Sequence, residues 1–144
     1  MPWAVIVKER EGSMTSEELK QMIFDHMDLG FLDNIIDMLR ADEKLIPLIT
    51  DMLQDERMRV RLGATALVEE LTKTHSGRLA EQIPALAELL KFESPTVRGD
   101  AAYVLGMLRD DSALPFLEER SEDENESVRE VILEAIAEIK GKVM

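Results

Sequence analysis

The chain contains no cysteine, and this absence excludes disulfide bonds, thiolate metal sites and thiol catalysis. Aromatic residues make up only 4% of the sequence, so its nine methionines and many leucines must fill much of the hydrophobic core. No apolar run approaches the ~18 residues that a membrane-spanning helix needs. The first 14 residues also lack the basic segment of a secretory signal. We therefore expect a cytoplasmic protein with no membrane partner.

Basic residues are also scarce, since 17 lysines and arginines stand against 30 aspartates and glutamates, for a formal net charge of −13. Nucleic-acid binding requires a basic surface that neutralises phosphates. The only basic cluster, Arg57, Arg59 and Arg61, is outnumbered by acids. We therefore expect no nucleic-acid partner, and instead a protein partner that is basic or neutral.

What the sequence does contain is one motif that occurs three times. A proline within an apolar run is followed thirteen residues later by a Val-Arg pair that opens another apolar run. The three copies are Pro47 with Val60-Arg61, Pro84 with Val97-Arg98, and Pro115 with Val128-Arg129. A fixed spacing repeated in this way is typical of stacked helical repeats.

Each Val-Arg pair begins a helix with one apolar face. Counted from the valine, offsets 0, 4, 7, 8 and 11 lie on the same face of a helix, and they are apolar in all three copies. These positions are Val60, Ala64, Leu67, Val68 and Leu71; Val97, Ala101, Val104, Leu105 and Leu108; and Val128, Ile132, Ala135, Ile136 and Ile139. We predict an all-α, right-handed α-α solenoid of about eight helices in four antiparallel pairs.

The motif also divides the chain into an arm and one repeat domain. Residues 1–14 lie outside the pattern and form an N-terminal arm or a disordered tail. Residues 15–144 form the domain, with a degenerate capping pair at 15–42 and regular pairs at 43–73, 78–108 and 111–141. We expect the first helices of the regular pairs at about 43–54, 78–91 and 111–120, and the second helices at about 56–73, 95–108 and 126–140. Six extra residues between Leu71 and Ile83 predict a longer polar connection.

These repeats resemble HEAT repeats of the short type found in phycobilisome-lyase-like proteins: an acidic turn, then Val-Arg, then a second helix rich in alanine and leucine. The resemblance implies a ladder in which a turn aspartate and the arginine six residues later join neighbouring repeats. Asp55 with Arg61 and Asp123 with Arg129 match this spacing. The middle repeat departs from it, because Phe92 stands six residues before Arg98, so Arg98 must pair with Glu93 or with an acid of a neighbouring repeat.

No arrangement typical of a catalytic or cofactor site is present. The chain has no glycine-rich phosphate loop, Gly-x-Ser-x-Gly motif or paired nucleophile and base. Metal-dependent hydroxylases of the HEAT type take iron ligands from His-Glu dipeptides, whereas neither His26 nor His75 is followed by glutamate. Asp25 and Asp28 flank His26, but neighbouring residues point around a helix and cannot converge on one ion. We therefore predict no catalytic residue, no metal and no cofactor.

Tyr103 is the only tyrosine, and it lies about 140° from the centre of the apolar stripe, so we expect it on the surface. The resemblance implies that second helices line the concave side, which would place Tyr103 in the middle of a groove. An exposed aromatic residue on a rigid groove suits an anchor for a partner; ordinary packing on a neighbouring helix is the alternative. The predicted groove residues are Arg59, Leu62, Ala66, Asp100, Tyr103, Met107, Glu130 and Glu134.

A glutamate stripe follows at the C-terminal end, and its members recur every four residues. They are Glu122, Glu126, Glu130, Glu134 and Glu138. Like charges at this spacing destabilise a helix by ~0.2–0.5 kcal/mol per pair. The stripe is either a solvated end of the array or the acidic part of a binding surface.

From these patterns we predict a non-catalytic protein-binding module or scaffold that holds its partner in the groove of the second helices. The resemblance leaves an alternative, a bilin lyase-like subunit or an accessory protein to an enzyme complex. The sequence leaves the oligomeric state open between a monomer and a weak dimer.

Overall fold

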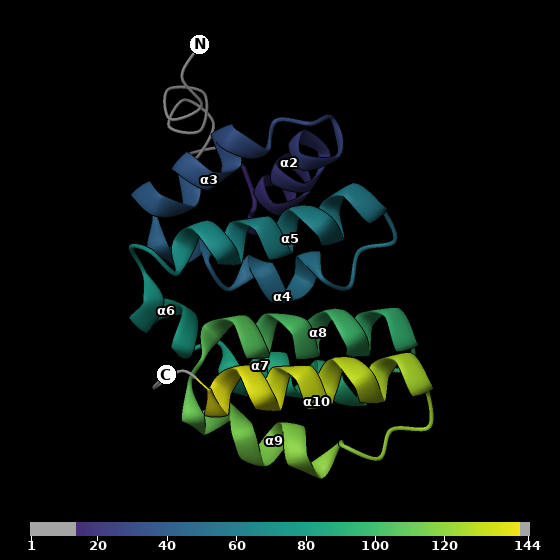
Figure 1. The fold of residues 1–144 in the computed structure, drawn as a ribbon. Coiled ribbons are helices and arrows are strands. Elements are labelled where there is room, and N and C mark those ends of the chain that lie inside the picture. Colours follow the sequence, from purple (N-terminus) through teal and green to yellow (C-terminus); the bar gives the residue numbers. More distant parts are fainter. Residues whose placement is uncertain (1–13, 142–144) are drawn as a thin grey trace.

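The computed structural model describes residues 14–141, which form a stack of helices (Figure 1). This range contains nine α-helices and no strand. The helices are α2 (Ser16–Asp28), α3 (Leu32–Ala41), α4 (Leu48–Met52), α5 (Met58–Leu71), α6 (Ser76–Ala80), α7 (Ile83–Glu88), α8 (Pro95–Leu108), α9 (Leu114–Glu119) and α10 (Glu126–Lys140). Three short 3-10 turns accompany them: η1 (Glu43–Leu45), η2 (Leu89–Lys91) and η3 (Asp111–Ala113). Apart from Met14, the predicted N-terminal arm lies outside the described residues.

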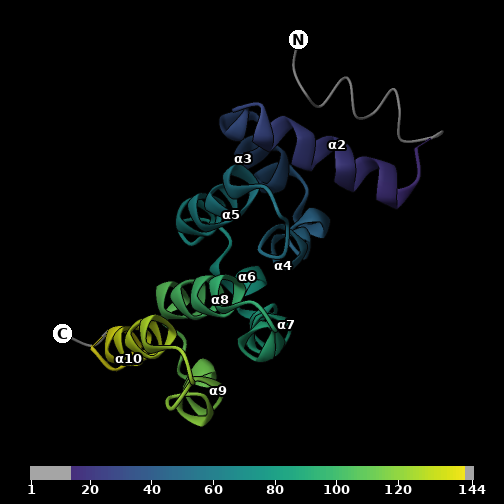
Figure 2. The same cartoon turned by 90° about the vertical axis from the view of Figure 1, so that its right-hand side faces the viewer.

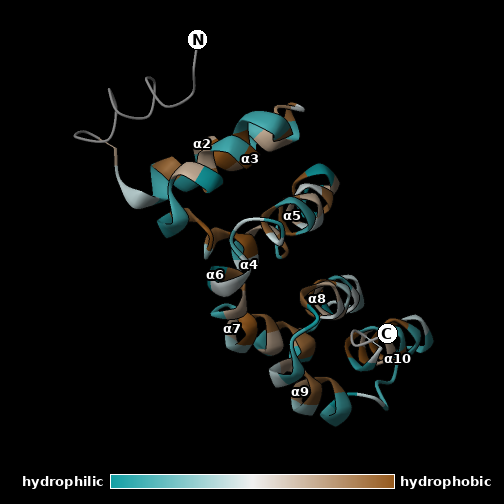
Figure 3. Ribbon diagram, turned by 60° about the vertical axis from the view of Figure 1, so that its left-hand side comes forward, coloured by the Kyte–Doolittle hydropathy of each residue, from teal (hydrophilic) through white to brown (hydrophobic). Residues whose placement is uncertain are grey.

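The helices stack as successive pairs, and the predicted all-α solenoid is confirmed. The second helices α5, α8 and α10 lie along one side of the array, and the first helices α4, α7 and α9 lie along the other (Figure 2). α8 lies between α5 and α10 along this side (Figures 2 and 3). Within the described range, no helix is long and apolar enough to cross a membrane.

Polar caps fix where the longer helices begin. The Thr15 hydroxyl accepts from Glu18 N–H at 3.1 Å, and the Glu18 carboxylate accepts from Thr15 N–H at 3.4 Å, a capping box at the start of α2. Ser94 and Asn125 cap α8 and α10 by accepting from the backbone N–H three residues on, at 3.4 and 3.1 Å. These bonds satisfy N–H groups that have no partner inside the helix. The second helices therefore begin close to the predicted residues.

Each predicted first helix contains a proline, and the observed first helices are shorter than predicted. Pro47 directly precedes α4, and Pro84 and Pro115 lie in the first turn of α7 and α9. Proline has no N–H and its ring clashes with the preceding turn of a helix. The residues before each proline therefore form a separate short element, which is η1, α6 or η3.

The six extra residues between Leu71 and Ile83 form more than a polar loop. They include α6, whose Leu79 is 2% exposed and so ties the insertion to the core. This element separates α5 from α7. The predicted polar connection, residues 72–77, ends earlier than expected, because α6 begins at Ser76.

The predicted apolar face forms the core. Thirteen of the fifteen wheel positions are buried, and only Leu108 and Ile136 are half-buried. In Figure 3 each long helix carries both hydrophobic and hydrophilic residues, as expected of amphipathic helices in a stack. The core is thus continuous from pair to pair, and the surface residues that differ between repeats remain available for binding.

Candidate functional site

A pocket of about 300 Å³ lies between α8 and α10 on the side formed by the second helices. Tyr103 lines it and is 57% exposed. The other lining residues are Gly106, Met107, Val131, Glu134, Ala135 and Glu138. Three of the predicted groove residues therefore line the same pocket: Tyr103, Met107 and Glu134. Its apolar floor and acidic wall suit a side chain that is part apolar and part cationic.

The two glutamates of this pocket differ in their surroundings. Arg109 Nε donates to the Glu138 carboxylate at 2.7 Å. Arg109 follows the last residue of α8 as its C-cap and has a left-handed backbone with φ of 52°. Glu134 has no ion-pair partner among residues 14–141. Its charge is therefore the one available to a ligand in the pocket.

The remaining predicted groove residues do not line this pocket. Arg59 and Leu62 are exposed on α5, where Arg59 Nη1 donates to Asp28 O at 3.3 Å. Ala66 is half-buried on α5, and Glu130 is exposed on α10. Asp100 is half-buried, and its carboxylate lies 4.0 Å from Arg61 Nε. Burial raises the pKa of Asp100 above its ordinary value, and the charge of Arg61 only partly offsets this.

Gly106 shapes the pocket, and sequence reasoning missed its role. A Cβ at Gly106 would lie 2.8 Å from both Cα and Cβ of Ala135, so α8 and α10 approach each other closely here. Gly106 on α8 and Ala135 on α10 lie opposite each other where the two helices are in contact. That pairing of small residues was the signal available in the sequence.

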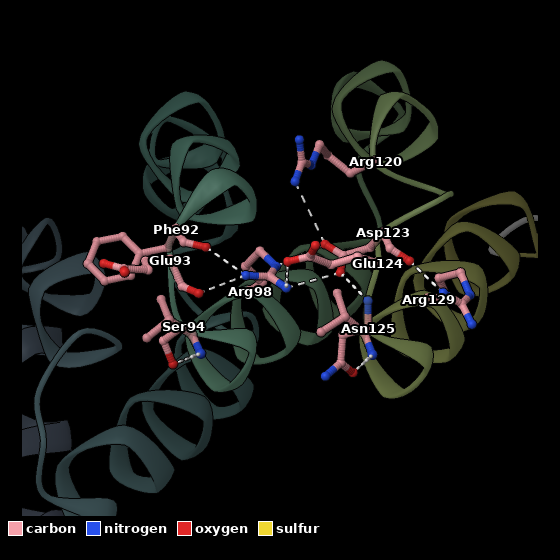
Figure 4. Close-up of polar contacts among 11 residues, drawn as sticks. Phe92, Glu93, Ser94, Arg98, Arg120, Asp123, Glu124, Asn125 and Arg129 are labelled. Atoms are coloured by element: carbon pink, nitrogen blue, oxygen red, sulfur yellow. Dashed lines mark hydrogen bonds and ion pairs between the residues drawn. The ribbon is translucent and has the colours of Figure 1, made fainter.

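A buried ion pair joins the last two repeats beside this surface. Arg98 Nε and Nη2 donate to the Asp123 carboxylate at 2.9 and 3.1 Å. Arg98 Nη1 also donates to the backbone oxygens of Phe92 and Glu93 in its own turn, at 2.9 and 3.0 Å. Figure 4 shows Asp123 between Arg98 and Arg129. The partner of Arg98 is thus an acid of the neighbouring repeat, one of the two options that the sequence left open, while Glu93 contributes only its backbone oxygen.

Hydrogen bonds lower the pKa of Asp123 despite its burial. Burial by itself raises this pKa, but the bonds from Arg98 and from the Asn125 N–H, together with the charges of Arg98 and Arg120, outweigh it. The carboxylate is therefore ionised and fully engaged at neutral pH.

The other ladder residues bond differently from the pairing that the spacing suggested. Arg61 Nη1 donates to the backbone oxygen of Asp55 at 2.8 Å, and Arg129 Nη1 donates to that of Asp123 at 2.7 Å. The Asp55 carboxylate instead accepts from Arg57 Nε at 3.0 Å, and this bond lowers the pKa of Asp55. At a separation of six residues, each arginine thus contacts the carbonyl of its own turn, and the carboxylate faces elsewhere.

The histidines do not converge on a metal site. His26 lies on α2, where its Nδ1 is 2.8 Å from Met22 O, and His75 precedes α6, where its Nδ1 is 2.7 Å from Thr74 Oγ1. Within residues 14–141, no group of three or more histidine, aspartate or glutamate side chains is arranged to hold a metal ion. The His-Glu ligand set of HEAT-type hydroxylases has no counterpart in that part of the chain.

Parts of this chain are similar in sequence to known proteins. A family model described as HEAT repeats matches residues 66–137, half of the chain. The chain is also similar to deoxyhypusine hydroxylase of Drosophila melanogaster, with 44% identity over 64 residues, which are 43% of this chain and 21% of that protein. It is similar to deoxyhypusine hydroxylase of Drosophila pseudoobscura pseudoobscura, with 43% identity over 61 residues, which are 41% of this chain and 20% of that protein. The chain thus spans about a fifth of the length of these curated relatives.

These relatives correct one prediction from the sequence. We predicted a chain with no catalytic role, but both relatives are named as an enzyme, so that prediction is wrong. It relied on the absence of short catalytic motifs. A similarity spread over about sixty residues leaves no trace in such motifs.

Proposed function

The chain belongs to the HEAT-repeat family, and on this premise we propose that it binds a partner protein along the side formed by α5, α8 and α10. Stacked repeats offer extended surfaces rather than deep cavities, which suits recognition of another protein. The centre of the proposed surface is the pocket between α8 and α10.

Tyr103 is the observation that carries this proposal. A tyrosine that is 57% exposed at the edge of a pocket has neither a core role nor a buried hydrogen bond to explain it. Tyrosine is enriched among residues that dominate binding energy, because it adds a large contact area at little cost in side-chain entropy. Leu62 and Met58, 60% and 64% exposed, are further exposed apolar residues, on α5.

The charge of this surface points to a basic or neutral partner. Glu134 and Glu138 line the pocket, and the whole chain carries a formal net charge of −13. A lysine or arginine side chain of the partner would place its apolar stem on Met107 and Tyr103 and its charge near Glu134. Specificity would then come from electrostatic complementarity and affinity from the apolar contact.

The test begins with capture of partners on the immobilised chain, followed by titration calorimetry with the partner that is found. We expect Tyr103→Ala to raise the dissociation constant at least tenfold, since loss of an anchor costs roughly 2 kcal/mol or more. Phe116→Ala is the matched control, because Phe116 is 38% exposed on α9 at the other side of the array. An unchanged dissociation constant for Tyr103→Ala, or an equal loss for the control, would refute this surface.

The relatives favour a second candidate function, participation in an enzymatic hydroxylation. Both are named deoxyhypusine hydroxylase, and we propose that this chain takes part in a reaction of that kind. The surface around Tyr103 would then hold the protein that carries the reacting residue. Hydroxylation takes one oxygen atom from dioxygen and two electrons from a reductant, so the captured partner would be incubated in an aerated cell extract that supplies both, with and without the chain. Mass spectrometry would then detect a mass increase of one oxygen atom that depends on the chain. No such increase under any condition would remove this candidate.

The phycobilisome-lyase-like subtype of HEAT repeat is also a proposal. A phycobilisome-lyase-like role would make the chain a bilin lyase-like subunit or an accessory protein to an enzyme complex. Mixing the chain with a bilin should then produce a stable shift in visible absorbance. A spectrum equal to that of free bilin would leave the protein-binding role and the hydroxylation role as the two candidates.

A further inference from the structure

One side of α10 matches, position by position, a side of α8 that is buried. On α10 this side is uncovered. The two helices correspond with an offset of 31 residues, which matches Val97 to Val128. On α8, a stripe of Arg98, Ala102 and Leu105 is 4%, 0% and 0% exposed. Spacings of four and three residues place such a stripe on one face of a helix, and Arg98 shows that this face looks toward the next repeat.

The matching stripe on α10 consists of Arg129, Leu133 and Ile136, which we name the outer face of α10. Leu133 is 56% exposed, and Arg129 and Ile136 are half-buried. The same positions that are covered in α8 are therefore uncovered in α10. Ile136 packs partly against the core of its own pair, whereas Leu133 is exposed.

The arginine of this face makes only one of the two kinds of contact that its counterpart makes. Arg98 binds the backbone oxygens of its own turn through Nη1 and the carboxylate of the next turn through Nε and Nη2. Arg129 binds the backbone oxygen of Asp123 through Nη1 at 2.7 Å. Over residues 14–141 no carboxylate lies within ion-pair distance of Arg129. What is lacking is an aspartate in the position that Asp123 has relative to Arg98 (Figure 4).

We propose that the outer face of α10 is a docking surface for a helix pair of a partner protein whose turn carries an aspartate. The aspartate binds Arg129 through Nε and Nη2, and apolar residues of the pair cover Leu133 and Ile136. This continues the α8–α10 interface by one more repeat and differs from the surface around Tyr103. Two features identify the occupant, the unmatched cation and the continuity with an interface that the structure contains.

A second copy of this chain has no aspartate within the turn that it would present. Stacked in the same direction, a second copy would offer its first turn, Leu29-Gly30-Phe31, to Arg129. This turn contains no carboxylate, so the ion pair would stay incomplete. The occupant is therefore a different helical repeat with an acidic turn.

The test supplies such a helix pair within the same molecule. Residues 1–141 are followed directly by a second copy of residues 111–141, which keeps the 31-residue spacing and brings an aspartate equivalent to Asp123. We expect one cooperative thermal transition, with a midpoint raised by about 5 °C or more. Arg129→Gln, or replacement of the added aspartate by asparagine, should remove most of this rise. Glu130→Gln on the neighbouring exposed position should retain it.

Two outcomes would overturn the proposal. One is an unchanged midpoint, or a separate low-temperature transition of the added pair, which would mean that the outer face of α10 does not accept an acidic-turn repeat. The other is self-association of the unmodified chain in sedimentation equilibrium that Leu133→Arg abolishes. That result would assign the face to a second copy instead.

Discussion

Arg98 and Asp123 form a buried ion pair across two successive repeats: Nε of Arg98 donates to the carboxylate at 2.9 Å, and the two side chains are 5% and 1% exposed. The same arginine binds two carbonyls of its own turn, and the same carboxylate accepts from the Asn125 N–H at 2.9 Å. The pair therefore fixes the distance and angle between one repeat and the next. It is the only rung of the ladder that is complete in the described part of the chain.

Removal of this carboxylate should destabilise the fold strongly. Asp123→Asn leaves the guanidinium of Arg98 buried without its counter-charge, and loss of one partner of a buried pair costs roughly 3–5 kcal/mol. Urea denaturation followed by circular dichroism measures the free energy of unfolding. Lys91→Gln is the control, because its contact with Glu88 spans 4.0 Å between exposed side chains and should matter by less than about 1 kcal/mol. Similar losses in both variants would contradict this role of Asp123.

The same residue should make the fold sensitive to acid. Because the native pKa of Asp123 is lowered, its carboxylate stabilises the fold above the unfolded pKa, and this contribution is lost as the pH falls through the native value. The free energy of unfolding of the unmodified chain should therefore decrease below about pH 4. Asp123→Asn should show a smaller decrease over the same range. Urea titrations between about pH 3 and pH 7 give both slopes, and equal slopes would count against the assignment.

A substitution at Phe92 should complete a second rung. Phe92 occupies the position of Asp55 and Asp123 in its turn and is 39% exposed, while Arg61 of the preceding repeat only approaches Asp100, at 4.0 Å. An aspartate at this position can bind Arg61 and accept from the Ser94 N–H, as Asp123 does from the Asn125 N–H. We expect Phe92→Asp to stabilise the fold by about 1 kcal/mol.

The control for this variant separates charge from backbone capping. Phe92→Asn can accept the same backbone N–H but carries no charge for Arg61, so it should give a smaller increase. In a double-mutant cycle, Arg61→Gln should cancel most of the effect of Phe92→Asp. Additive effects would show that Arg61 does not reach the new carboxylate.

The helices and their stacked fold could be predicted from the sequence, but the contacts between repeats could not. Apolar periodicity locates α8 and α10, and Ser94 and Asn125 mark where they begin. The resemblance implied a ladder of turn aspartates and arginines between neighbouring repeats but did not say which residues pair across them, and the structure shows that the Asp123 carboxylate binds Arg98, 25 residues earlier. Periodicity reports which side of a helix is apolar, whereas this pairing depends on how far one repeat is rotated against the next. Tyr103 was predicted to be exposed by its angle on the helix, but its pocket depends on Gly106, whose effect appears only when two helices are packed.

Charge reversal at the pocket should slow association with a basic partner. Glu134 lines the pocket and has no ion-pair partner within the described residues, so Glu134→Lys changes the local field without breaking a contact in the chain. The expected result is a several-fold lower association rate at low salt, with a smaller difference as salt screens the charges. Glu119→Lys, an exposed residue of α9, is the matched control for net charge. Stopped-flow measurements at several salt concentrations give the association rates. If both variants slow association equally, the proposed surface is wrong.

Two glycines of α8 should respond to alanine in opposite directions. At Gly106 a Cβ would lie 2.8 Å from Cα and Cβ of Ala135, and backbone atoms of α10 cannot move aside as a flexible side chain can. Gly106→Ala should therefore push α10 outward and destabilise the fold by about 1–3 kcal/mol. At Gly99 a Cβ meets nothing within 4 Å, so Gly99→Ala should stabilise α8 by about 0.5–1 kcal/mol through helix propensity. Thermal denaturation of both variants compares the same substitution in one helix. A stabilised Gly106→Ala would mean that α8 and α10 are not in close contact, and the pocket beside Tyr103 would then need a different origin.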